Sequence, residues 1–147
     1  MPNAIDAAKF FLAQANEDAG DLVSNLKLQK LVYYAQGFHL AVYGTPLFGE
    51  EIEAWTHGPV VPDVYHHFKH HGSGSIPVPT DFDQSVFSFE QLTLLNEVQQ
   101  IYGQYSAWRL REMTHEEAPW KNNYKPGEHN LRIPKDEMAA FFKDYIK

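Results

Sequence analysis

The chain of 147 residues contains no cysteine, which excludes disulfides, thiolate metal sites and cysteine nucleophiles. It also lacks a Gly-x-Ser-x-Gly nucleophile motif and a glycine-rich phosphate loop. No uninterrupted apolar stretch approaches the length of a membrane span, and the first residues do not resemble a signal peptide. These absences leave few routes to catalysis and predict a soluble, cytoplasmic protein without a membrane partner.

Basic residues are also scarce. The 12 Lys and Arg stand against 19 Asp and Glu, which gives a formal net charge of −7. Such a surface repels phosphate groups, so nucleic acid is a disfavoured partner. Hydrophobic residues make up 44% of the chain and aromatic residues 14%, enough for one substantial core. We therefore expect residues 1–147 to form a single domain.

Apolar residues recur at helical spacing along most of the chain. The pattern predicts a mainly α, single compact domain of about six helices, with one short extended or β segment near residues 47–57. The Gly58-Pro59 pair is expected to end that segment. The expected helices cover 4–16, 25–42 and 63–71, and three more begin near 89, 107 and 134. A turn is expected at 17–21, and polar loops at 73–85 and 121–132.

Local signals mark several of these helix ends. Ser24 or Asn25 is expected to cap the second helix, Ser88 opens a capping box with Gln91, and Ser106 caps the fifth helix. Within the second helix, a stripe of apolar residues from Leu28 to Val42 is expected to face the core. Gly37 lies in the middle of that helix, where glycine costs about 1 kcal/mol relative to alanine. We take it as a sign that another helix approaches closely.

The heptad Thr114–Trp120 (THEEAPW) has more polar and aromatic residues than an amphipathic helix needs. Thr114 and Glu117 have the spacing of a capping box, which explains both. His115 and Trp120 are left unexplained by capping. A histidine with a nearby glutamate can perform acid–base catalysis, but no nucleophile or substrate-binding motif accompanies this pair.

The third expected helix carries four histidines, His66, His67, His70 and His71. Their i,i+4 pairs have the spacing by which two imidazoles share a metal. The sequence offers no third or fourth ligand and no metalloprotease glutamate beside the first histidine. We therefore expect a solvated histidine-rich face and predict no metal or cofactor. A small metal-assisted hydrolase that uses these histidines is the alternative.

Aromatic residues supply the candidates for a binding surface. Trp55 and His57 lie in one cluster near prolines, Tyr65 follows it, and His115 and Trp120 form a second cluster. Large aromatics with a polar group are enriched in interface hot spots, although most are core residues.

Other aromatic residues are expected inside the protein. Trp108, inside a helix, is expected in the core. Tyr33 and Tyr34 lie beside Lys27 and Lys30, a mixture that can bind single-stranded nucleic acid. A helix packed on both sides explains these tyrosines better in so acidic a chain.

Several sequence blocks together resemble the Panacea domain, the SocA-like antitoxin family that is also called phage-associated or GepA-like. The first block is LKLQKLVYYAQG at 26–37. It is followed by PLFxE at 46–50, IEAWxxGPV at 52–60, YGxYSA at 102–107 and THxExPW at 114–120. Each block is weak alone, but several in the same order are specific. The match extends from the first expected helix to the last.

The resemblance implies a mainly α-helical antitoxin that is encoded beside a toxin gene, often in a prophage or other mobile element. Members of the family neutralise unrelated toxins by direct binding. One branch delivers its toxin to a AAA+ protease as an adaptor, and some members carry an extra DNA-binding domain. The family supplies no catalytic residues to transfer to this chain.

We therefore predict a non-enzymatic antitoxin whose partner is a cognate protein toxin. The residues predicted to contact the toxin are Trp55, His57, Tyr65, His115 and Trp120. The acidic surface is expected to steer a basic partner. A proteolytic adaptor, with a AAA+ protease as a further partner, is the second hypothesis.

Overall fold

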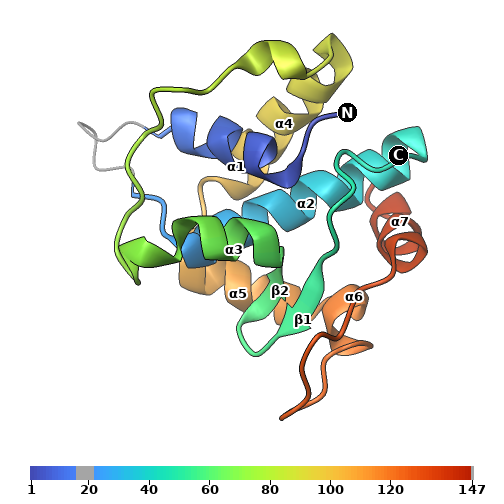
Figure 1. Ribbon diagram of the computed structural model, residues 1–147. Helices are drawn as coiled ribbons and strands as arrows, with labels where there is room; N and C mark the ends of the chain where they lie inside the picture. Colours follow the sequence, from blue (N-terminus) through green and yellow to red (C-terminus); the bar gives the residue numbers. More distant parts are fainter. Residues whose placement is uncertain (16–21, 147) are drawn as a thin grey trace.

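A long helix, α2 (Asn25–Tyr43), runs through the middle of the protein, with the other helices packed around it (Figure 1). The computed structural model describes residues 1–15 and 22–146. The chain forms one compact, mainly α-helical domain, as the sequence predicts. The other α-helices are α1 (Ala4–Ala13), α3 (Pro62–Phe68), α4 (Phe89–Tyr102), α5 (Ala107–His115), α6 (Ala118–Lys121) and α7 (Lys135–Lys143). The remaining elements are strands β1 (Glu53–Trp55) and β2 (Gly58–Val60) and the 3₁₀ turns η2 (Lys69–His71) and η3 (Gln84–Val86).

The central position of α2 is confirmed by its burial. Tyr33 and Tyr34 have no exposed surface, so the helix packs on both sides. Ser24 caps its start by accepting a hydrogen bond from the backbone N–H of Lys27, and Gly44, with a φ of 72°, ends it. The predicted apolar stripe is wrong at its end, because 48% of Val42 is exposed. The last turn of α2 extends past the core.

Most predicted helix boundaries are confirmed. Ser88 and Gln91 form the capping box of α4, and the Ser106 hydroxyl accepts the N–H of Arg109 at the start of α5. The first helix is shorter than expected and ends at Ala13. The turn predicted at 17–21 lies outside the described residues.

The extended segment is a two-stranded antiparallel hairpin (β1 and β2 in Figure 1). The expectation that Gly58-Pro59 ends the extended structure is wrong, because both residues belong to β2 and pair with Trp55 and Ala54. The chain turns at Thr56 and His57, and Gly58, the first residue of β2, takes a φ of 111° that glycine tolerates best. The hairpin therefore occupies residues 53–60, whereas the extended segment was predicted near residues 47–57.

The segment predicted as a loop at 121–132 is partly ordered against the same hairpin. The N–H of Ala54 donates to Leu131 O at 2.8 Å, and the N–H of Ile133 donates to Ile52 O at 2.8 Å. Both edges of β1 are therefore occupied.

The described residues contain seven α-helices rather than six. The additional helix is α6, a single turn that begins beside Pro119, where a missing N–H costs nothing. The third helix is interrupted as well, because α3 ends at Phe68 and the 3₁₀ turn η2 continues to His71.

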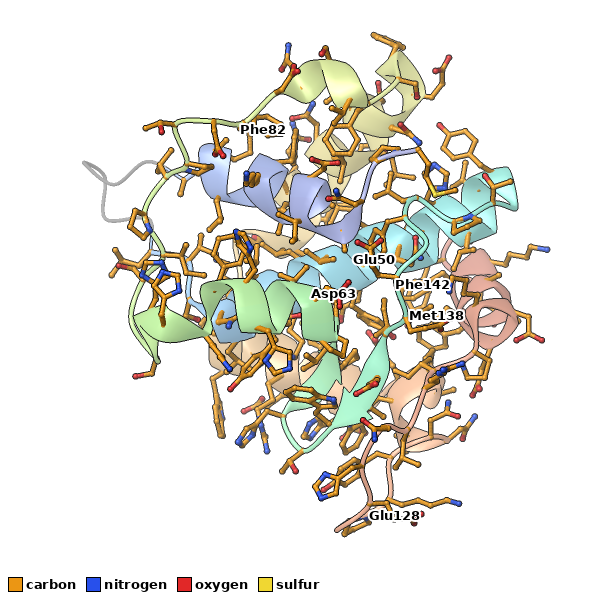
Figure 2. The ribbon with its side chains drawn as sticks, in the orientation of Figure 1. Glu50, Asp63, Phe82, Glu128, Met138 and Phe142 are labelled. Atoms are coloured by element: carbon orange, nitrogen blue, oxygen red, sulfur yellow. The ribbon has the colours of Figure 1, made fainter. Side chains whose placement is uncertain are left out.

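Helix α7 packs along α2 at Gly37, the residue of α2 that has no side chain. Met138 and Phe142, labelled in Figure 2, lie on the side of α7 that faces α2, and at most 1% of either is exposed. A Cβ placed on Gly37 would overlap the Phe142 ring. The predicted close approach at Gly37 is confirmed, and the neighbouring helix is α7.

Candidate functional site: the hairpin and its supports

The hairpin is fixed to α2 by a buried lysine. Lys30 has no exposed surface, and its ammonium group donates a hydrogen bond to Pro59 O at 3.1 Å. Burial, with a smaller contribution from the charge of Arg111, lowers the pKa of Lys30 to about 7. Lys30 therefore supplies no exposed positive charge for nucleic acid. Its role in the fold is to donate a hydrogen bond to the Pro59 carbonyl, which accepts none from the paired strand.

Two further polar residues of α2 hold the chain after the hairpin. The side-chain oxygen of Gln29 accepts the N–H of Val61 at 2.9 Å, and its nitrogen donates to Asn25 Oδ1 at 2.7 Å. The nitrogen of Asn25 in turn donates to Tyr65 O at 3.1 Å. One row of polar groups on α2 thus positions β2 and the start of α3.

A Gly58→Ala variant is expected to lose about 1–3 kcal/mol of unfolding free energy. The φ of 111° is unfavourable for alanine, and the new methyl carbon would lie 2.6 Å from Lys30 Cε and 2.9 Å from Thr114 Oγ1. Urea denaturation measures the loss. Gly49→Ala is the matched control, because no heavy atom lies within 4 Å of the Cβ position of Gly49. Equal stability of the two variants would contradict this account of the hairpin.

A second buried charged residue, Glu117, lies at the start of α6. Tyr33 donates to its Oε1 at 3.0 Å, and Tyr34 donates to its Oε2 at 2.8 Å. Burial raises the pKa of Glu117 to about 7, against the opposing effect of the two tyrosine hydrogen bonds. Burial and the Glu117 charge raise the pKa of both tyrosines. Glu117 thus ties the α5–α6 turn to the middle of α2.

The capping box predicted for Thr114 and Glu117 is wrong. Thr114 lies in the last turn of α5, and its hydroxyl donates to Arg111 O at 2.9 Å instead of capping a new helix. Glu117 occupies the N-cap position of α6 but makes no side-chain cap hydrogen bond. Its carboxylate points to the tyrosines because they are its hydrogen-bond donors in the protein interior.

The aromatic residues predicted from the same heptad stack on one another. The Trp120 ring lies 3.9 Å from the His115 ring, with planes 5° apart, and 4.7 Å from the Tyr124 ring on its other side. Its indole N–H donates to Trp55 O at 2.7 Å. Trp120 is half-buried and connects α6 to the hairpin.

The His115 ring is one end of this stack. Burial, followed by the charges of Arg111, Lys30 and His57, lowers its pKa. Its Nε2 is buried and has no hydrogen-bond partner among the described residues.

The other three predicted residues, Trp55, His57 and Tyr65, lie on the hairpin and on α3. Trp55 and Tyr65 meet edge to face at 5.0 Å, and the Trp55 indole donates to Glu53 Oε1 at 2.9 Å. His57 is exposed at the hairpin turn, and its Nδ1 accepts a hydrogen bond from Arg111 Nε at 2.9 Å. We use the term hairpin surface for Trp55, His57 and Tyr65, which His115 and Trp120 support from behind. The fold thus brings all five predicted residues into one neighbourhood.

Trp108 borders this surface instead of lying in the core. It is 56% exposed, and the Arg111 guanidinium lies 4.4 Å from the centre of its ring. The core expectation is wrong because α5 buries the face that carries Leu110 and Thr114, which turns Trp108 outward.

A pocket of about 990 Å³ lies beside the hairpin surface. Ligand pockets commonly reach this size. Its walls come from the hairpin, the first turns of α2 and α5, and the loop that follows α6; Figure 2 labels Glu128 on that loop. Side chains that line it include Trp55, His57, Tyr65, Trp108 and Tyr124.

The histidine cluster adjoins the hairpin surface, because the His66 ring lies 5.4 Å from the Tyr65 ring. The change from α3 to η2 separates His66 and His67 from His70 and His71, so the i,i+4 pairs do not share one regular helix. Within residues 1–15 and 22–146, no three His, Cys, Asp or Glu side chains are arranged to hold a metal ion.

Sequence reasoning missed the buried charges and Arg111. Lys30 and Glu117 have partners 29 and 83–84 residues away, and no local pattern indicates such contacts. The contact between Trp108 and Arg111 could have been predicted from the sequence, because residues at i and i+3 are neighbours on a helix.

The fold and the site define a small helical protein that presents an aromatic hairpin on a rigid helical support. Residues 28–121, more than half of the chain, match the Antitoxin SocA-like, Panacea domain family, and the chain belongs to that family. The matched residues include most of α2, the hairpin and the Thr114–Trp120 heptad, so the recognition of the family from sequence is confirmed. The family match covers neither α1 nor α7, so it is shorter than the expected extent from the first helix to the last.

One curated relative is Antitoxin SocA of Caulobacter vibrioides (strain NA1000 / CB15N). The two chains are 50% identical over 50 residues, which cover 34% of this chain and 27% of the relative. The match thus spans about a quarter of the length of the Caulobacter protein. No solved structure matches the chain. In the described part of the chain, no helix is long and apolar enough to cross a membrane.

Proposed function

We propose that this protein is the antitoxin of a toxin–antitoxin pair and neutralises its toxin by direct binding through the hairpin surface. Membership of the SocA-like antitoxin family supports the role. The observation that carries the binding site is the arrangement of Trp55, His57 and Tyr65 on one partly exposed face beside a large pocket. Aromatic side chains of this kind supply most of the binding energy in protein interfaces.

The supports behind the hairpin favour tight binding. The Trp120 stack and the Lys30 hydrogen bond hold the hairpin in one conformation before any partner arrives. A surface that is already ordered loses less conformational entropy on association. The net charge of −7 speeds encounter with a basic toxin through long-range attraction.

The buried charges support binding rather than catalysis. Residues with strongly shifted pKa values often mark active sites. Here Lys30 has no exposed surface and Glu117 is only 9% exposed. Each is engaged in hydrogen bonds that hold structural elements together, and this structural role explains its burial beside a concave region.

The product of the adjacent gene is the reagent that tests this function. Expressed alone, it is expected to stop growth, and co-expression with this protein is expected to restore growth. Trp55→Ala or Tyr65→Ala is expected to weaken the complex by at least about 2 kcal/mol, because a true anchor residue costs this much when truncated. Isothermal titration calorimetry with the purified toxin measures the loss.

Phe89→Ala is the matched control for these variants. Phe89 is a 79% exposed aromatic residue on α4, outside the hairpin and its supports, and its removal should leave binding unchanged. If Trp55→Ala and Phe89→Ala bind the toxin equally, the hairpin is not the contact face. If co-expression shortens the lifetime of the toxin, the protein is a proteolytic adaptor, whereas occlusion predicts a stable complex.

A further inference from the structure

Arg111 is held in place from two sides at the edge of the hairpin surface. Its Nε donates to His57 Nδ1 at 2.9 Å, and its guanidinium lies 4.4 Å above the exposed Trp108 ring. His57 lines the pocket of about 990 Å³, while Arg111 lines a second hollow of about 620 Å³. The hydrogen bond between His57 and Arg111 therefore links the linings of two concave regions.

The guanidinium of Arg111 has donors to spare. Arginine carries five N–H groups, and the bond to His57 uses only the one on Nε. Arg111 forms no ion pair within the residues that the structure describes. Arg109, on the same helix, differs in this respect, because its guanidinium pairs with Glu112 at 3.4 Å. The planar Nη fork of Arg111 is thus oriented by its neighbours but not matched by an anion.

The hollow that Arg111 lines is also lined by Glu112, Glu116 and Glu117, and none of these carboxylates forms an ion pair with Arg111. Two of these carboxylates have other partners: Glu112 pairs with Arg109, and Glu117 accepts hydrogen bonds from Tyr33 and Tyr34. Arg111 is therefore a cation without an anionic partner among these neighbours, and such a cation favours an incoming negative charge.

We propose that Arg111 determines the specificity of the hairpin surface by binding an Asp or Glu carboxylate of the partner protein in a bidentate pair. The proposal rests on the proposed function, because it names the chemistry that the toxin presents to the same surface. Guanidinium forks match carboxylates in geometry, and tryptophan and arginine are the residues most enriched at interface hot spots. The aromatic flanks and the net charge of −7 favour a protein side chain over a polyanion.

A peptide assay tests Arg111 without the toxin. The probe is a blocked pentapeptide with a central glutamate between two phenylalanines, compared with its glutamine twin. We expect the glutamate peptide to bind about tenfold more tightly, because a hydrogen bond to a charged group is worth that factor. Arg111→Gln should abolish the preference, and Arg109→Gln, the matched control, should retain it. Changes in tryptophan fluorescence report binding, and melting temperatures confirm that each variant is folded.

Arg111→Lys is used if Arg111→Gln does not fold. Lysine keeps an aliphatic stem over Trp108 but loses the planar fork, so most of the preference should disappear. Absence of a preference in the wild type, whether both peptides bind or neither does, overturns the assignment, and so does a preference that survives in the Arg111 variants. A phosphoserine peptide that binds more tightly than the glutamate peptide would also overturn it, in favour of a phosphate ligand.

The two proposals fail separately. If the adjacent gene product is harmless or is not neutralised, the antitoxin function fails, while the peptide preference can still hold. If neutralisation succeeds and the preference is absent, only the role of Arg111 fails.

Discussion

A Phe142→Ala variant is expected to lose about 3–5 kcal/mol of unfolding free energy, the usual cost of removing a buried phenylalanine ring. Phe142 has no exposed surface. Its ring centroid lies 4.7 Å from that of Phe38, 5.5 Å from Tyr33 and 5.9 Å from Tyr34. The loss is large because one ring fills the contact between α7 and α2 and also packs against both tyrosines that hold Glu117. Urea denaturation followed by circular dichroism measures it.

A double-mutant cycle with Gly37 sharpens this prediction. Gly37→Ala alone is expected to destabilise the protein by about 1–3 kcal/mol, because the new methyl group overlaps the Phe142 ring. In the Phe142→Ala background the same change should stabilise the protein by up to about 1 kcal/mol, since alanine favours the helix and the ring is gone. If Gly37→Ala has the same effect in both backgrounds, the close approach of α2 and α7 does not explain the glycine.

The second large effect is a dependence of stability on pH that comes from the two buried charges. The pKa of Glu117 is raised from 4.5 to about 7, so between these values the folded protein keeps a proton that the unfolded chain has lost. Raising the pH from 4.5 to 7 therefore lowers stability. The pKa of Lys30 is lowered from 10.5 to about 7, so the unfolded chain holds the extra proton and stability rises as pH increases above 7. These two groups together favour a stability minimum near neutral pH.

Variants isolate each contribution. The difference in unfolding free energy between wild type and Glu117→Gln should fall by about 3 kcal/mol between pH 4.5 and 7, at up to about 1.4 kcal/mol per pH unit. The variant must be compared with the wild type at each pH, because other groups also change the stability. Burial lowers the pKa of His39 and His115, which makes the wild-type stability rise with pH below 6.5, opposite to the effect of Glu117. The exposed Glu116→Gln is the matched control, because it makes the same chemical change outside the protein interior.

The corresponding difference for Lys30→Met should rise between pH 7 and 9.5. Higher pH is avoided, because burial raises the pKa of Tyr33 and Tyr34, which adds a loss of stability once the unfolded tyrosines ionise. A flat difference curve for both Glu117→Gln and Lys30→Met would show that neither group keeps its shifted pKa in solution.

Local signals were sufficient for most helix boundaries and for the family. Ser24, Ser88 and Ser106 cap the helices that they were expected to cap, because a cap depends on neighbours within one turn. The same local reasoning was wrong for Thr114 and Glu117. Their spacing satisfies a capping box, but the Tyr33 and Tyr34 hydroxyls compete for the glutamate from the far side of the core. A motif of four residues contains no information about donors more than 80 residues away.

The candidate site shows the same division. The sequence selected Trp55, His57, Tyr65, His115 and Trp120 from residue type and position alone, and the fold brings them together; their contact with a toxin stays a proposal. It did not select Arg111, and it assigned Trp108 to the core. Which face of α5 is outward depends on how α5 packs against α2 and β2, and that packing is not readable from nine residues.

The sequence alone determined that the protein is mainly helical, that it is acidic and that it has no cysteine chemistry. It also carried the family signature LKLQKLVYYAQG. The tertiary structure decided what that signature does: Gln29 and Lys30 hold the hairpin, Tyr33 and Tyr34 hold Glu117, and Gly37 admits Phe142. Helix periodicity and capping arise from neighbours along the chain, so composition and spacing reveal them. The environment of a buried charge and the exposure of a tryptophan depend on partners that only folding brings together.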